Sequence, residues 1–276
     1  MKVPIGIFDS GYGGLTILEQ IRKQLPKYDY LYLGDNARSP YGTRSFEVVY
    51  EFTLQAVRWL FRQGCRLVIL ACNTASAKAL RTIQQKDLPF IDPERRVLGV
   101  IRPTVENINK ITDSFHVGIL GTQGTITSNS YPLEIEKLFP DIFVEGEACP
   151  MWVPLVENNE YDKPGADYFI KQHIDNILKK DNRIDTLILA CTHYPLLEKK
   201  IREYLPEGIR VVSQGQLVAE SLADYLRRHS AIASGCSKNG NCRFYTTESE
   251  EKFASMASLF LKGKIEAERV NLEDAE

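Results

Sequence analysis

Two stretches of the chain share one pattern of apolar and polar positions. In each, a short unbroken apolar run ends in Ala-Cys and passes into a helical pattern: residues 67–76 read Leu-Val-Ile-Leu-Ala-Cys-Asn-Thr-Ala-Ser, and residues 186–195 read Thr-Leu-Ile-Leu-Ala-Cys-Thr-His-Tyr-Pro. Continuous apolar runs of this length are typical of buried parallel strands. The pattern predicts a thiol, Cys72 or Cys191, at the carboxyl end of each strand, where open α/β sheets bind ligands.

The rest of the chain alternates strand-like runs with helical patterns, which predicts an α/β fold with parallel sheets. Strands are expected at residues 2–8, 30–33, 67–70, 97–101, 116–120, 142–147 and 186–189. Val211-Val212 opens a passage, residues 213–228, that could return to the first part of the fold. Helices are expected at residues 15–25, 45–63, 75–85, 104–111, 130–139, 167–178 and 196–204. A loop or short helix is expected at 154–157, a Gly-, Ser- and Asn-rich loop at 234–243, and a frayed acidic tail at 271–276.

A second pair of similar segments supports an internal repeat. Residues 117–120, Val-Gly-Ile-Leu, resemble residues 5–8, Ile-Gly-Ile-Phe, at an offset of 112 residues, and the two Ala-Cys stretches are 119 residues apart. Such similar offsets predict two copies of one array of strands and helices. Two similar lobes facing each other would bring the thiols to opposite sides of one cleft.

Composition narrows the class of protein. The chain has 276 residues, 43% of them hydrophobic and 25% charged, and a formal net charge of −2, as in an ordinary globular protein. This balance gives no reason to expect nucleic acid or an anionic membrane surface as a partner. The first apolar run is too short for a signal peptide, and no run has the length of a transmembrane helix, so we expect a cytoplasmic protein. Its six cysteines are then expected to be reduced.

A glycine-rich turn follows the first predicted strand. Residues 9–14 read Asp-Ser-Gly-Tyr-Gly-Gly, and such glycines let backbone N–H groups approach a small anion closely. The turn lacks the final spaced glycine of the dinucleotide fingerprint, and its acidic residue precedes the turn. It therefore favours a small ligand over NAD.

Two thiols on opposite faces of a small substrate suit a reaction in which one removes a proton and the other delivers one, which would invert a carbon acid. Candidate groups that adjust the thiols are Asp9, His193 and Glu157. Candidate hydrogen-bond donors to a substrate carboxylate are Asn73, Thr74 and Thr192.

Several motifs together resemble those of the glutamate racemase family, within the cofactor-independent aspartate/glutamate racemase superfamily. They are Asp9-Ser10-Gly11-x-Gly13-Gly14, Gly34-Asp35 with Pro40-Tyr41-Gly42, Ala71-Cys72-Asn73-Thr74-Ala75, Gly121-Thr122 and Ala190-Cys191-Thr192-His193-Tyr194-Pro195, in the family's order over about residues 5–220. The resemblance implies two pseudo-symmetric, flavodoxin-like lobes with the active site in the cleft between them, the first formed by residues 1–97 and 212–276 and the second by residues 98–211.

The resemblance also implies an activity: interconversion of L- and D-glutamate by a homodimer without pyridoxal phosphate or metal, which supplies D-glutamate for peptidoglycan and so for cell wall biogenesis and cell shape. By motif, Cys72 would take the α-proton from D-glutamate and Cys191 from L-glutamate, assisted by Asp9 and His193 respectively, and Glu157 would tune the site. The residues implied to bind substrate are Asp9, Ser10, Tyr41, Gly42, Asn73, Thr74, Thr122, Thr192 and His193.

The chain departs from the family pattern in two places. Where the family usually has an Ile-Asp-Ser type sequence, this chain has Val212-Ser213-Gln214-Gly215, which leaves open any role for an acidic residue there. The predicted loop at 234–243, with Cys236 and Cys242, lies outside the family motifs; without further Cys or His partners it is interpreted as a solvated loop rather than a metal site.

Other interpretations stay open at this point. A racemase of aspartate or another acidic amino acid is the nearest; a single-thiol decarboxylase of the same fold fits less well, because both cysteines are present. A protein of a different class could clamp a carboxylate ligand without chemistry, or bind a partner such as a topoisomerase, and would need neither thiol. Among single residues, Asp9 could cap a helix, Tyr41 could serve in packing, and Cys65 and Cys149 are interpreted as packing residues.

Overall fold

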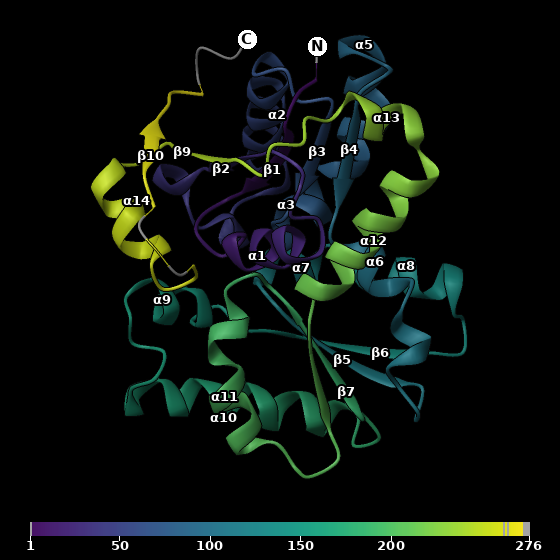
Figure 1. Cartoon of the computed structure of the whole chain (residues 1–276). Coiled ribbons are helices and arrows are strands. Elements are labelled where there is room, and N and C mark those ends of the chain that lie inside the picture. Colours follow the sequence, from purple (N-terminus) through teal and green to yellow (C-terminus); the bar gives the residue numbers. More distant parts are fainter. Residues whose placement is uncertain (1, 262, 264, 273–276) are drawn as a thin grey trace.

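Two parallel β-sheets, one in each half of the molecule, organise the chain (Figure 1). The computed structural model describes residues 2–261, 263 and 265–272. The larger sheet has the order β10 (Ala267–Arg269), β9 (Cys242–Thr246), β2 (Tyr30–Gly34), β1 (Ile5–Asp9), β3 (Leu67–Leu70) and β4 (Arg96–Gly99). The smaller has the order β6 (Phe143–Ala148), β5 (His116–Gly121), β7 (Thr186–Ala190) and β8 (Arg210–Ser213). The predicted α/β fold with two parallel-sheet lobes is confirmed.

The strand orders repeat between the sheets. The order β2-β1-β3-β4 in the first sheet matches β6-β5-β7-β8 in the second, so β3 corresponds to β7 and β1 to β5. In the larger sheet β1 pairs in parallel with β2 and β3, and in the smaller sheet β5 pairs in parallel with β6 and β7. The predicted domain limits at 97/98 and 211/212 stay a prediction, and each falls inside a strand, β4 or β8.

Helices connect the strands and cover the sheets (Figure 1). They are α1 (Leu15–Gln24), α2 (Phe46–Arg62), α3 (Asn73–Lys78), α4 (Leu80–Thr82), α5 (Leu88–Ile91), α6 (Ile101–Val105), α7 (Gln123–Thr127), α8 (Ser130–Leu138), α9 (Trp152–Glu157), α10 (Pro164–Lys180), α11 (Glu198–Tyr204), α12 (Gly215–Arg228), α13 (Ser230–Gly235) and α14 (Glu250–Ala257). Short 3₁₀ turns occupy Asn36–Arg38, Tyr41–Thr43, Ile108–Lys110 and Tyr194–Leu197, and a π turn occupies Ile83–Asp87.

Packing between the lobes holds the site together. After β8 the chain leaves the smaller sheet, and α12 packs against α1 of the larger lobe. A single apolar cluster contains Ile7 and Leu15 of the larger lobe, Leu187 and Trp152 of the smaller lobe, and Leu222 of α12. Because this core is shared, the strand ends that carry the candidate site residues are held in a fixed relation.

Two predicted helices are divided in the structure. The helix expected at 75–85 begins earlier, because the Cys72 side chain accepts a hydrogen bond from the Ala75 backbone N–H and so caps α3. It then passes through α4 into the π turn. The helix expected at 104–111 is α6 followed by a separate 3₁₀ turn, Ile108–Lys110.

The loop predicted at 234–243 is wrong at both ends. Its first residues complete α13 and its last residues begin β9, which lies between β2 and β10 inside the larger sheet. The carboxylate of Asp29 accepts hydrogen bonds from the backbone N–H groups of Asn239 and Asn241 and so fixes the turn. Cys236 is buried rather than solvated. Of the predicted tail, Leu272 is buried, and residues 273–276 lie outside the described residues.

Within the part of the chain that the structure describes, no helix is both long enough and apolar enough to cross a bilayer.

Candidate active site

The two thiols occupy equivalent places in the two sheets. Cys72 comes two residues after β3 and Cys191 directly after β7, the strands that correspond by sheet order. Each side chain is only 6% exposed. The charge of Cys191 acts on the titration of Cys72, so the two sulfurs lie within electrostatic reach of each other. The predicted position of a thiol at the carboxyl end of each strand is thus observed.

The surroundings of Cys72 are neutral hydrogen-bond donors and one nearby acid. The Ser10 hydroxyl lies 3.3 Å from the Cys72 sulfur, and the Ala75 backbone N–H donates to the same sulfur at 3.4 Å. Burial, followed by the negative charge of Asp9, raises the pKa of Cys72 to about 12, although both donors oppose the rise. At neutral pH this side chain is therefore a thiol that can give up a proton.

The surroundings of Cys191 are different, because an imidazole lies beside it. Nδ1 of His193 is 4.0 Å from the Cys191 sulfur, and Nε2 of the same ring is 2.9 Å from Oε1 of Glu157. Burial alone would lower the pKa of His193, but hydrogen bonds with Cys191 and Glu157 raise it to about 10. At neutral pH the ring is an imidazolium, and its positive charge stabilises negative charge on the Cys191 sulfur.

Asp9 connects the two halves of the site. Its side chain is fully buried, Oδ2 accepts the Gly11 backbone N–H at 2.9 Å, and Oδ1 accepts the Thr192 hydroxyl at 3.4 Å. Burial raises the pKa of Asp9, while the charge of His193 opposes the rise. The acid predicted to serve Cys72 therefore also touches the segment that carries Cys191.

The glycine-rich turn lets the lobes approach closely. A Cβ atom at Gly13 would lie 2.4 Å from Oγ1 of Thr192 and 2.5 Å from Nδ1 of His193. These distances are shorter than any van der Waals contact, so only glycine fits at this position. The turn is thus built around the Thr192-His193 segment of the other lobe.

The predicted hydroxyl donors meet across the lobe boundary. Oγ1 of Thr74, on α3, lies 2.9 Å from Oγ1 of Thr122, which caps α7. Gly42 packs against the same threonine, because a Cβ atom there would lie 2.7 Å from Cβ of Thr122. Asn73, next to Cys72, is buried and hydrogen-bonded to Gln214 and Tyr131.

Tyr41, a predicted substrate-binding residue, has its hydroxyl bound to an acid of its own lobe. Its hydroxyl donates to the Asp35 carboxylate, and its ring packs beside Phe8 and Phe52 in the apolar core of the larger lobe. Because Asp35 holds this hydroxyl, a contact of Tyr41 with substrate stays a prediction.

Four residues near the site were not predicted from the sequence. The Ser39 hydroxyl lies 3.5 Å from Oε1 of Glu157, and the Thr125 hydroxyl lies 3.4 Å from that of Thr74. Gln214 and Tyr131 are hydrogen-bonded to the Asn73 carboxamide. A sequence feature could have pointed to Gln214, since it lies in the segment that departs from the family pattern. The others carried none, because single Ser, Thr and Tyr residues in helices and loops are common.

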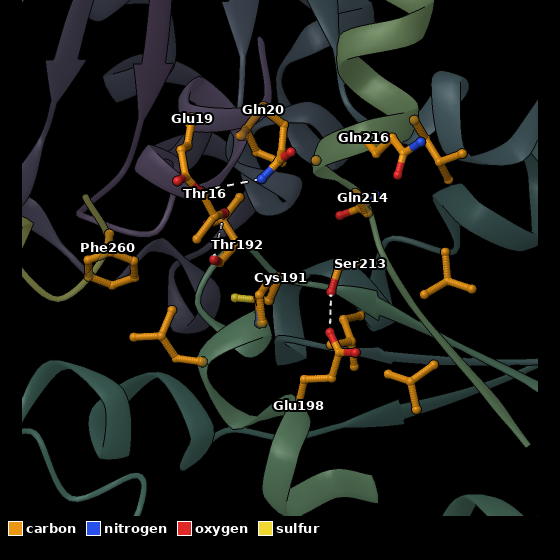
Figure 2. A pocket seen from close by; sticks show the side chains of 18 of the residues that line it. Thr16, Glu19, Gln20, Cys191, Thr192, Glu198, Ser213, Gln214, Gln216 and Phe260 are labelled. Atoms are coloured by element: carbon orange, nitrogen blue, oxygen red, sulfur yellow. Dashed lines mark hydrogen bonds between the residues drawn. The ribbon is translucent and has the colours of Figure 1, made fainter. Parts of the chain in front are cut away.

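A cavity of about 660 Å³ opens beside Cys191 (Figure 2). Its walls come from α1, α12, β8 and the turn after Cys191, and include Thr16, Thr192, Phe260 and the hydrogen-bonded pair Ser213 and Glu198. Cys72 does not line it, so this space lies on the Cys191 side of the site. It is large enough to admit a small molecule to that thiol.

The described residues contain no group of three or more His, Cys, Asp and Glu side chains that could hold a metal ion. The side chains in place include two thiols, an imidazolium and two carboxyl groups, which are all groups that can donate or accept a proton. A reaction without cofactor stays a prediction.

Several known glutamate racemases resemble the chain over nearly its full length. A family model described as Asp/Glu/Hydantoin racemase matches residues 12–222. The glutamate racemase of Ruegeria sp. is 40% identical over 271 residues, which cover 95% of this chain and 97% of the relative. A crystal structure of a glutamate racemase isoform from Bacillus anthracis has a TM-score of 0.88 and 37% identity, covering 98% of both chains. The glutamate racemase of Francisella tularensis, solved in complex with D-glutamate, has a TM-score of 0.88 and 32% identity, covering 99% of both chains.

Proposed function

The chain belongs to the Asp/Glu/hydantoin racemase family, and from this premise we propose that it interconverts L- and D-glutamate with Cys72 and Cys191 as the two bases. The observation that carries the mechanism is the pair of thiols at equivalent strand ends in two similar sheets. A carbon acid held between them can lose a proton to one sulfur and gain a proton from the other, which inverts its configuration.

From the different surroundings of Cys72 and Cys191 we infer which thiol accepts a proton first when L-glutamate binds. The pKa of Cys72, raised to about 12 by burial and by Asp9, keeps that sulfur protonated, while the imidazolium of His193 stabilises a thiolate at Cys191. In this state Cys191 takes the α-proton of L-glutamate, and the Cys72 thiol then delivers its own proton to the opposite face. The product is D-glutamate, with Cys191 as thiol and Cys72 as thiolate, which is the state that acts on D-glutamate.

The remaining residues hold the substrate and the bases. Ser10 and the Ala75 N–H stabilise the Cys72 thiolate once it forms, because both hydrogen-bond to the sulfur. The hydroxyl oxygens of Thr74 and Thr122 lie 2.9 Å apart, and both hydroxyls can donate to a substrate carboxylate. The carboxamide of Asn73 and the hydroxyl of Thr192 are further donors. Glu157 holds the imidazolium of His193 in place.

The proposal includes the cellular role implied by the relatives. A racemase of this kind acts in the cytoplasm as a homodimer, needs neither pyridoxal phosphate nor metal, and supplies D-glutamate for peptidoglycan. Each part can be tested separately, by dialysis against chelator, by the mass of the protein in solution, and by the requirement of a gene deletion strain for D-glutamate.

The decisive experiment follows both configuration and the α-hydrogen. Metal-free and cofactor-free protein is incubated with each glutamate enantiomer in deuterium oxide, beside Cys72→Ser, Cys191→Ser and the control Cys242→Ser, which changes a thiol away from the site. We expect the wild type and the control to racemise glutamate and incorporate deuterium. Each site variant should lose racemisation by about 100-fold to 10,000-fold.

The single variants also test the assignment of faces. With only Cys72 left, slow exchange of the α-hydrogen should be confined to D-glutamate, and with only Cys191 left, to L-glutamate. If either variant exchanged both enantiomers, the two-base assignment would be wrong. If the protein racemised aspartate but not glutamate, the assigned substrate would be wrong. If it exchanged the α-hydrogen of neither amino acid, a binding protein would be indicated.

A further inference from the structure

Gln214 lies at the junction where the chain passes from β8 of the smaller sheet into α12, which packs on the larger lobe (Figure 2). Its side chain is 2% exposed, although a carboxamide has two donors and an acceptor to satisfy. A buried carboxamide at a junction between lobes is costly unless these groups are paired.

All of its hydrogen-bonding groups are used, by three different elements. Oε1 accepts from Nδ2 of Asn73 at 2.7 Å, and Nε2 donates to the Tyr131 hydroxyl at 2.6 Å and to Oγ1 of Thr104 at 2.7 Å. These partners lie on α3, α8 and α6 respectively. Gln214 therefore ties the larger lobe, through Asn73, to the smaller lobe, through Tyr131 and Thr104.

The contacts close into a ring. The Tyr131 hydroxyl, which accepts from Gln214, donates to Oδ1 of Asn73 at 2.7 Å, and Asn73 in turn donates to Gln214. Every bond in the ring runs in the same direction, and such chains strengthen one another in a buried setting. The ring fixes which end of the Asn73 carboxamide is the donor, and it uses only one of the two Nδ2 hydrogens of Asn73.

We propose that Gln214 and Tyr131 are positioning residues, which orient the Asn73 carboxamide toward the substrate and make that orientation depend on the contact between the lobes. The inference rests on the proposed function, since it gives the N–H of Asn73 that the ring does not use a substrate carboxylate to bind. Asn73 directly follows Cys72, so the ring also sets the place of substrate relative to that thiol.

The test uses Gln214→Met, which keeps the length of the side chain and removes its polar groups. The matched control is Gln172→Met, on the exposed side of α10 and away from the cavity beside Cys191. We expect the Gln214 variant to lower kcat/KM for glutamate about 10-fold to 100-fold, mainly through KM, and to weaken D-glutamate binding measured by calorimetry. The control should leave both unchanged.

Coupling to Asn73 separates positioning from a structural effect. If Gln214 acts through Asn73, the Gln214→Met change should have almost no further effect on kcat/KM in an Asn73→Ala background. An equal loss in both backgrounds would overturn the inference, as would a loss that follows only the fraction of folded protein. If Gln214→Met does not fold, Tyr131→Phe removes only the hydroxyl and should show the same dependence on Asn73.

The two proposals fail in different ways. If the wild type does not racemise glutamate, the proposed function fails. If the wild type racemises glutamate while Gln214→Met and Tyr131→Phe match it in KM and binding, the function stands and the positioning role is wrong.

Discussion

The Glu157 carboxylate holds the His193 imidazole by a partly buried contact, with Oε1 2.9 Å from Nε2. The opposite nitrogen of that ring faces the Cys191 sulfur at 4.0 Å. Cys72 has no imidazole beside it, and its sulfur is contacted by Ser10 and a backbone N–H instead. Two thiols at equivalent strand ends therefore have different charged and polar neighbours, and several measurements can detect that difference.

The Glu157–His193 pair should appear in the pH dependence of stability. The pKa of His193 is raised to about 10 in the folded protein by its hydrogen bonds, against burial, whereas an imidazole in the unfolded chain titrates near 6.5. The stabilisation is therefore complete below about pH 6.5 and is lost as the pH rises through about 10. We expect Glu157→Gln to lower the free energy of unfolding most at the acidic end of this range, with the difference from wild type shrinking toward pH 10.

Urea unfolding followed across this pH range measures the effect. Glu160→Gln is the matched control, because Glu160 lies on the same stretch and pairs with Lys163 at the surface. A Glu157→Gln difference that did not vary with pH would show that the carboxylate stabilises the fold without holding a proton on His193.

Asp9 should have opposite effects on thiol reactivity and on catalysis. Burial and the charge of Asp9 raise the pKa of Cys72, so Asp9→Asn should lower that pKa and speed alkylation of Cys72 by iodoacetamide severalfold. Racemisation should nevertheless fall about 100-fold, because the proposed assistance to Cys72 is removed. Alkylation is followed by mass spectrometry in a Cys191→Ser background. Slower alkylation in the Asn variant would contradict the charge assignment.

Ser10 tests the donor that stabilises a Cys72 thiolate. Its hydroxyl lies 3.3 Å from the sulfur and lowers the pKa that burial raises. We expect Ser10→Ala to slow alkylation of Cys72 and to lower kcat about 10-fold, since a hydrogen bond to a charged group is worth about 1.5–3 kcal/mol. Ser10→Thr, which keeps the hydroxyl, should recover part of the rate. Equal rates for the Ala and Thr variants would argue for a packing role.

The sequence predicted the positions of the two thiols better than the contacts between side chains of the two lobes. The apolar runs before Cys72 and Cys191 identify buried strands locally, and the repeat identifies two sheets, so the two thiols could be placed at strand ends. The contact of Thr74 with Thr122 depends on how the lobes approach each other, which no local pattern encodes. For Tyr41 the motif could not show that its hydroxyl is held by Asp35, so its contact with substrate stays a prediction. The strand β9 was missed because a Gly-, Ser- and Asn-rich segment precedes it, and tertiary pairing with β2 decides its conformation.

Gly13 offers the sharpest test of how closely the lobes must approach. A Cβ atom there would lie 2.4 Å from Oγ1 of Thr192 and 2.5 Å from Nδ1 of His193, so Gly13→Ala has to displace the segment that follows Cys191. A displacement of about 1 Å in a catalytic group can lower the rate about 100-fold. Gly165→Ala is the control, because Gly165 lies in the first turn of α10 with no atom within 4 Å of an added Cβ, and it should be neutral or slightly stabilising. Racemisation rates and thermal unfolding of both variants decide the matter: a Gly13→Ala protein with wild-type turnover would show that Thr192 and His193 can move without harm, and their assigned roles would then be wrong.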